Sequence, residues 1–108
     1  MADYLFIQSQ DPFTETRTIG QYELAARLAQ AGNRVSVVLV QNGVSPARQG
    51  ADCNPFDALA DSPVTVLADA FALRQREIGT NQLKKYVQVC ALDVVVEAML
   101  AGHKVIWN

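Results

Sequence analysis

Two short apolar runs on either side of one amphipathic helix constrain the fold of this chain more than any other feature. The runs Tyr4–Gln8 (YLFIQ) and Val35–Val40 (VSVVLV) are rich in β-branched and aromatic residues, which is typical of strands buried on both faces. Between them, a helix is expected over Thr18–Ala31, with Thr18 as its cap and Gly32 ending it. A strand, a helix and a strand in this order form a right-handed βαβ unit. The chain is therefore predicted to belong to the α/β class.

The rest of the chain continues this alternation. Further strands are expected at Val64–Leu67, Val87–Cys90 and His103–Trp107, and further helices at Phe71–Ile78 and Leu92–Ala101. The β-branched run Val94–Val96 would also allow a strand, but the flanking signals favour the helix. Between them, Val44–Ser62 has a looser pattern, with short helical turns at Ser45–Arg48 and Phe56–Asp61. The sum predicts one domain over residues 1–108, a three-layer sandwich around a mostly parallel sheet of roughly five strands.

Charge and hydropathy exclude several classes of partner. Nine Lys and Arg stand against eleven Asp and Glu, and no basic run is longer than Lys84-Lys85, so a nucleic-acid partner is not expected. Lys84-Lys85 and the segment Arg74–Glu77 are interpreted as a solvated face. No apolar stretch approaches the ~18 residues that span a bilayer, and the start of the chain has no signal-peptide pattern, which predicts a cytoplasmic protein without a membrane partner.

The inventory of strong metal ligands is too small for a metal site. The chain has two cysteines and one histidine, and neither cysteine belongs to a CxxC pair. A disulfide framework is not expected from two cysteines, and both should be free thiols in a reducing compartment. The sequence therefore predicts neither a bound metal nor another cofactor.

Five polar residues follow the predicted strand ends or lie on the neighbouring loops and helix starts. Open α/β sheets place their ligand sites at the carboxyl ends of the strands, so these residues could line one shared pocket there. Within that pocket, Arg17 and Arg74 would hold an anion by bidentate hydrogen bonds. The simpler alternative is a solvated rim of ordinary surface charges. The five residues are Asp11, Arg17, Asn42, Asp69 and Arg74.

Cys90 and Cys53 are the candidate catalytic residues. Cys90 ends a predicted strand just before a helix, and a helix N-terminus lowers the pKa of a thiol. The alternative is that Cys90 is a small buried hydrophobic residue. Cys53 lies on a predicted loop, better exposed to a partner but without a base beside it, and a loop cysteine without function is the alternative there.

Four pieces of the sequence, in order, resemble one known family over nearly the whole chain. They are YLFIQSQDPF, LAARLAQAGNRVSVVLVQNGV, VTVLADAFALRQREIG and LDVVVEAMLAGHKVIW. This pattern is similar to the DsrE/DsrF-like (YchN-like) sulfur-relay family. The resemblance implies the α/β fold described above, a homotrimer or homohexamer, and a context in sulfur metabolism, with a sulfur-carrier protein as a further partner.

The resemblance also implies a persulfide-carrying cysteine at the end of the third strand. That position falls at Ala68 or within a residue or two of it, and this chain has Ala68, Asp69 and Ala70 there. A methyl group cannot carry a sulfane sulfur. The leading hypothesis is therefore an accessory or non-catalytic homo-oligomer that binds a partner protein or a small anionic ligand. Two alternatives stay open: a sulfurtransferase that uses Cys90 or Cys53 as its carrier, and a plain small-ligand binding module.

Overall fold

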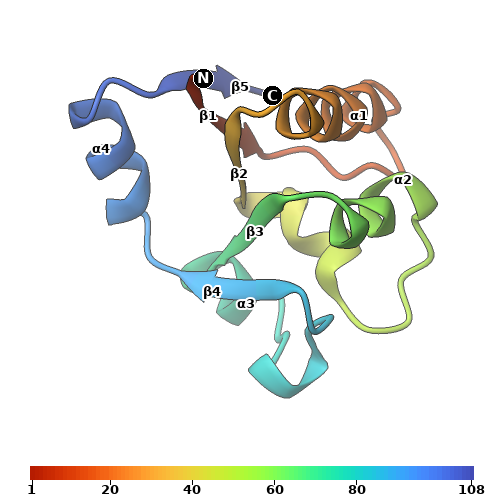
Figure 1. Ribbon diagram of the computed structural model, residues 1–108. Coiled ribbons are helices and arrows are strands. Elements are labelled where there is room, and N and C mark those ends of the chain that lie inside the picture. Colours follow the sequence, from red (N-terminus) through yellow and green to blue (C-terminus); the bar gives the residue numbers. More distant parts are fainter.

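The computed structural model covers residues 1–108 and contains one five-stranded sheet in which every strand pair is parallel (Figure 1). The strand order across the sheet is β4-β3-β2-β1-β5, so β4 and β5 form its edges. The predicted α/β class with a mostly parallel sheet is confirmed. The strands are β1 (Asp3–Gln8), β2 (Arg34–Leu39), β3 (Val64–Asp69), β4 (Val87–Cys90) and β5 (Lys104–Trp107).

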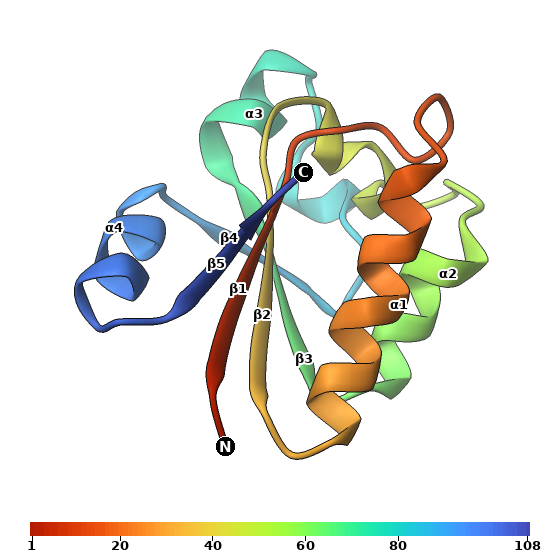
Figure 2. The ribbon, with the colours of Figure 1, turned by 90° about the horizontal axis from the view of Figure 1, so that it is seen from above.

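The helices form layers on both faces of the sheet. Figure 2 shows α1 and α2 on one face, α4 on the other, and α3 at the edge where the strands end. None of the helices is long and apolar enough to cross a bilayer. The α-helices are α1 (Arg17–Gln30), α2 (Asn54–Asp57), α3 (Ala70–Gln75) and α4 (Asp93–Leu100), and the 3₁₀ helices are η1 (Gln41–Ala47), η2 (Ala58–Asp61) and η3 (Thr80–Gln82).

The predicted start of α1 is wrong, whereas its predicted end is correct. Thr18 is not the cap: Thr16 holds that position without a side-chain capping bond, and Thr18 is fully buried within the first turn. The Thr18 hydroxyl instead accepts a hydrogen bond from the Asn108 amide at 3.1 Å, a partner that local sequence does not reveal. The other end is as predicted, because Gly32 has φ +98° and reverses the chain just after the helix.

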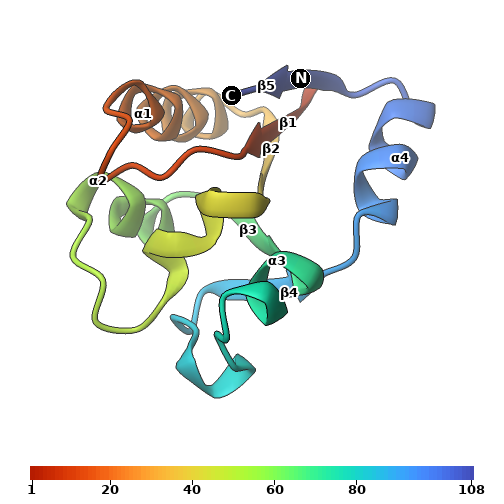
Figure 3. The same ribbon diagram turned by 180° about the vertical axis from the view of Figure 1, so that it is seen from behind.

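The two faces of the sheet are buried to very different extents. The face under α1 and α2 carries a cluster of 19 buried residues that includes Phe6, Tyr22 and Phe56. The opposite face has only five, and Ala98 is the one buried residue of α4. Figure 3 shows that α4 lies by itself, away from the other helices. The thinly covered side therefore leaves large apolar side chains exposed, namely Phe71, Leu92, Val96, Met99, Leu100 and Trp107.

Candidate functional site

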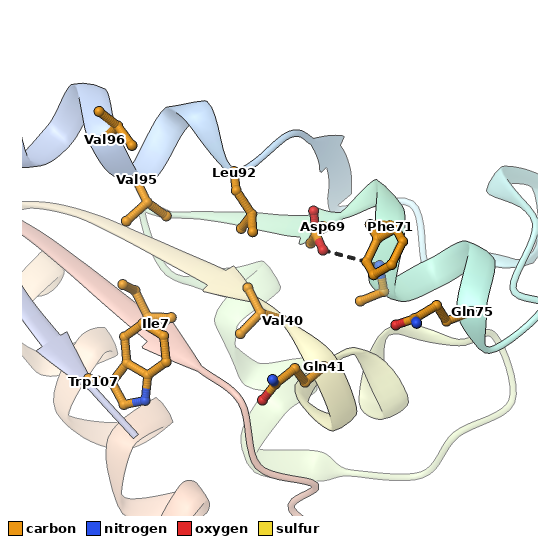
Figure 4. Close-up of a pocket in the computed structure, with 11 residues that line it drawn as sticks. Ile7, Val40, Gln41, Asp69, Phe71, Gln75, Leu92, Val95, Val96 and Trp107 are labelled. Carbon is orange, nitrogen blue, oxygen red and sulfur yellow. Dashed lines mark hydrogen bonds between the residues drawn. The ribbon is translucent and has the colours of Figure 1, made fainter.

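An apolar cavity of about 450 Å³ opens at the carboxyl ends of the strands, between α3 and α4 (Figure 4). Eight of its eleven lining residues are hydrophobic, and the three polar ones are Gln41, Asp69 and Gln75. Concave, mostly apolar pockets with a few polar groups are the usual form of small-molecule sites, and this edge is where α/β sheets place them. The apolar wall comes from Ile7, Val40, Phe71, Ala72, Leu92, Val95, Val96 and Trp107.

Just after β2, beside the cavity, the chain passes very close to the end of β1. A Cβ atom on Gly43 would lie 2.0 Å from the carbonyl oxygen of Gln8, so only glycine fits against the end of β1. Two residues earlier, Gln41 adopts φ +50°, which non-glycine residues rarely do. This tight turn directs the chain from β2 into η1 and places Gln41 on the cavity wall.

Asp69 brings the only charged side chain to the cavity. It is the last residue of β3 and the N-cap of α3, and the residue as a whole is 5% exposed. Its Oδ2 atom accepts the Ala72 N–H at 3.1 Å. The short helix α3 therefore begins where Asp69 satisfies one of its free backbone N–H groups.

The other four residues of the predicted pocket do not line the cavity. Asp11 accepts hydrogen bonds from the Phe13 N–H and the Ser45 hydroxyl, both at 2.9 Å. The side chain of Asn42 accepts a 2.8 Å hydrogen bond from Arg76. Both residues therefore serve as local connections between loops at this edge of the sheet.

The two arginines expected to hold an anion are directed elsewhere. Arg17 forms a two-pronged ion pair with Glu15, and its side chain is 85% exposed. Hydrogen bonds from Arg17 lower the pKa of Glu15 to about 2. Arg74 is exposed on α3. Because neither guanidinium faces the cavity, the predicted anion clamp is not assembled, and of the five residues only Asp69 lines the site.

Cys90 lies beside the cavity without the expected activation. It pairs in register with Asp69 at the ends of β4 and β3. Burial, together with the negative charges of Asp69 and Asp93, raises the pKa of the Cys90 thiol from an ordinary 9.0 to about 11. The expectation that the following helix would lower this pKa is wrong, because α4 begins three residues later and burial and the two carboxylates both disfavour the thiolate.

Cys53 is buried, contrary to the expectation of an exposed loop thiol. It is 6% exposed and belongs to the large core cluster with Tyr22 and Phe56. The loop folds inward here because α2 begins at the next residue and inserts Phe56 into the core. A partner molecule could reach this thiol only after the loop opens.

A second polar cluster, on the opposite side of the sheet, was missed by sequence reasoning. Lys84 Nζ lies 2.7 Å from Asp57 Oδ1, and the Tyr86 hydroxyl donates to the same oxygen at 2.6 Å. Burial opposes ionisation of Asp57, but these hydrogen bonds outweigh it and lower its pKa. Lys84 is therefore not part of a solvated face, since its side chain is only 13% exposed. The Lys84-Lys85 pair gave no signal for this, because its partner is 27 residues away.

Three cavity residues also went unrecognised as site residues. Gln41 and Gln75 are polar residues of a common type with no motif around them. Trp107, the last residue of a predicted strand, is 67% exposed and forms one end of the cavity wall. Across the chain, no group of three or more His, Cys, Asp or Glu side chains is close enough to hold a metal ion.

Comparison with known proteins gives a likeness in fold. No protein-family model and no curated protein matches the sequence. Among solved structures, the ychN protein of E. coli has a TM-score of 0.88 at 17% identity, over 100% of both chains. A protein of unknown function from Methanobacterium thermoautotrophicum, MTH1491, has a TM-score of 0.84 at 20% identity, again over 100% of both chains. A third, BT1422 from Bacteroides thetaiotaomicron, is also of unknown function and has a TM-score of 0.77 at 14% identity, covering 98% of this chain and 95% of that one. At these identities the likeness concerns the backbone, and the chain shares the α/β fold of the ychN protein.

Proposed function

We propose that this protein is a non-catalytic, DsrE-like binding protein that serves a sulfur-handling pathway without carrying sulfur itself. The observation that carries the proposal is the end of β3, where Ala68 and Asp69 occupy the place in which the family resemblance expects a persulfide cysteine. Persulfide formation needs a thiolate, and neither a methyl group nor a carboxylate can replace it. The likeness to the ychN protein supports a DsrE-like fold. The absence of a cysteine at this strand end supports a role that does not include carrying sulfur.

The cavity supports binding as that role. Its size and apolar wall suit a small molecule or an apolar side chain of a partner protein, such as a cytoplasmic sulfur carrier. The anionic ligand expected from Arg17 and Arg74 has lost its support, because neither residue lines the cavity and the one charged group there is the carboxylate of Asp69. We therefore exclude a small anion from the proposal.

A second candidate function uses Cys90 as a relocated sulfur carrier. Its register with Asp69 keeps the thiol at the carboxyl edge, near the site where the family's cysteine is expected. In that reaction the Cys90 thiolate would attack the outer sulfur of a donor persulfide and release the donor thiolate. A thiol pKa near 11 leaves about one hundredth of the thiolate present at the ordinary 9.0, which weighs against this route at neutral pH.

Sulfur loading distinguishes the two functions. After incubation with a persulfide donor, we expect the intact mass of the wild type, Cys53→Ser and Cys90→Ser to show no added sulfur. A cysteine that reacts with a persulfide gains one sulfur atom, and a reducing agent removes it again. A reducible gain of one sulfur in the wild type that disappears in Cys90→Ser alone would establish the carrier function and exclude ours.

We further propose that the protein assembles with itself, as a homotrimer or homohexamer. Met99 and Leu100 support this, because they are large, exposed residues at the end of α4 and lie outside the cavity wall; Leu100 is 83% exposed. Contiguous exposed apolar surface commonly marks an interface. Light scattering is expected to give the mass of three or six chains, and a smaller mass for Leu100→Lys. Phe13→Lys, the same kind of change at an exposed residue on a distant loop, should leave the mass unchanged. A monomeric wild type would contradict the proposal.

A further inference from the structure

Asp69 is a nearly buried carboxylate without a counter-charge. No Lys, Arg or His nitrogen lies within 4.0 Å of it, since the ion pairs of the chain involve other carboxylates. Its Oδ2 atom caps α3, but Oδ1 has no hydrogen-bond partner in the chain. Oδ1 keeps some accessible surface, and Asp69 lines the cavity. Buried charges in proteins are normally paired, and the chain itself supplies Asp69 with one backbone N–H but no cation.

The rest of the cavity favours a cation over an anion. No basic side chain lines it, and the two amides of Gln41 and Gln75 are neutral. Burial is the main cause of the raised pKa of the neighbouring Cys90 thiol, and the carboxylates of Asp69 and Asp93 add to it by disfavouring a second negative charge. A positively charged group next to Asp69 would be favoured by the same local potential.

The shape of the site indicates what the charge should be attached to. In Figure 4, Asp69 and Phe71 lie at one end of the cavity, Trp107 and Ile7 at the other, and Leu92 and Val95 between them on the α4 side. A ligand that reaches Asp69 therefore lies along apolar and aromatic side chains. The unusual backbone of Gln41, at φ +50°, adds a strained residue to the same wall, and such residues concentrate at binding sites.

We propose that the cavity binds a small apolar amine, with its ammonium group donating to Oδ1 of Asp69 and its hydrocarbon or aromatic body between α4 and the strand ends. This inference rests on the proposed binding function of the same edge and names its ligand class. The cavity volume is within the range of small-molecule sites, and a charge-assisted hydrogen bond in an apolar setting gives the amine its selectivity.

Three probes of one shape test the inference: phenylpropylamine, phenylpropanol and phenylpropanoate. Trp107 is the only tryptophan of the chain and lines the cavity, so its fluorescence reports binding, and thermal shifts provide a second readout. We expect the amine to bind about tenfold more tightly than the alcohol, and the carboxylate most weakly. Asp69→Asn keeps a residue that caps helices and should reduce the amine's affinity to that of the alcohol. Asp52→Asn, the same change at an exposed residue outside the cavity, should alter nothing.

A second variant avoids substitution of the buried residue. Leu92 is half exposed at the cavity wall, and Leu92→Lys supplies an ammonium group that competes for Asp69, so amine binding should weaken about tenfold. Leu92→Gln loses the same apolar contact without adding a charge, so it should weaken amine binding less. Equal affinity for all three probes, or binding insensitive to Asp69→Asn, would overturn the amine inference and leave a binding function in place. Absence of binding by every probe would also overturn it, whereas the proposed function is judged separately by sulfur loading.

Discussion

Replacing Gly43 by alanine is expected to destabilise the protein by about 3 kcal/mol, a fall of roughly 12 °C in melting temperature. The added Cβ would lie 2.0 Å from the carbonyl oxygen of Gln8 and 2.8 Å from its carbonyl carbon. Both are backbone atoms at the carboxyl end of β1, an inner strand of the sheet. The same oxygen accepts the Val40 N–H at 3.0 Å. The neighbouring backbone cannot move away without breaking that hydrogen bond, so β1 and the start of η1 must separate.

Gly20→Ala is the matched control for this substitution. Gly20 lies within α1, and a Cβ there would meet nothing within 4 Å. Alanine in an exposed helix interior is better than glycine by about 0.5–1 kcal/mol, so this variant should melt at a slightly higher temperature. Thermal unfolding followed by circular dichroism measures both. A Gly43→Ala protein that melts within about 2 °C of the wild type would mean that the chain does not pass this closely at β1.

The strands were the most predictable part of the fold, because their signal is local. Buried β-branched runs identify β1 and β2 to within one residue at each end. The third strand was predicted too short: it continues through Ala68 and Asp69 because these residues pair with Val89 and Cys90 of β4. That extension depends on a strand about 20 residues further along the chain, which local pattern does not contain.

The candidate site was less predictable, because strand order fixes an edge but not the direction of side chains. All five residues proposed for the pocket follow strand ends or neighbouring turns, yet Arg17 pairs with Glu15 two residues before it. Only Asp69 is directed by its own role, as the cap of α3, toward the cavity. The cavity itself depends on where α3 and α4 lie, which is set by tertiary packing rather than by any motif.

The surroundings of the two thiols could not be predicted from the sequence either. A cysteine before a helix is a reasonable signal for a lowered pKa, but the direction of the pKa shift depends on how deeply the thiol is buried and on which charges lie beside it. Burial of the Cys90 thiol is the main cause of its raised pKa, and Asp69 of the adjacent strand and Asp93 of α4 add to it. Cys53 was misjudged for a related reason, since the loop that carries it is drawn into the core by Phe56.

Phe56→Ala is expected to cost about 3–5 kcal/mol of unfolding free energy, as for other fully buried aromatic residues. Phe56 is 0% exposed and is the apolar anchor of the four-residue helix α2. Its ring lies 5.3 Å from that of Tyr22 and 5.8 Å from that of Tyr86, and the Lys84 ammonium lies 5.5 Å from its centre. Removing the ring therefore creates a cavity and also loosens the contacts beside the Asp57 ion pair.

Phe71→Ala makes the same chemical change at an exposed position. Phe71 is 58% exposed, so its loss should change the unfolding free energy by less than about 1 kcal/mol. Denaturant titrations of the two variants compare the large core under α1 and α2 with the thin α4 side in one experiment. An equally small loss of unfolding free energy in the two variants would mean that α2 is not anchored by Phe56. A large loss confined to Phe56→Ala is the expected result, because most of the buried core lies on the face away from the cavity, which leaves the α4 side available for the binding proposed above.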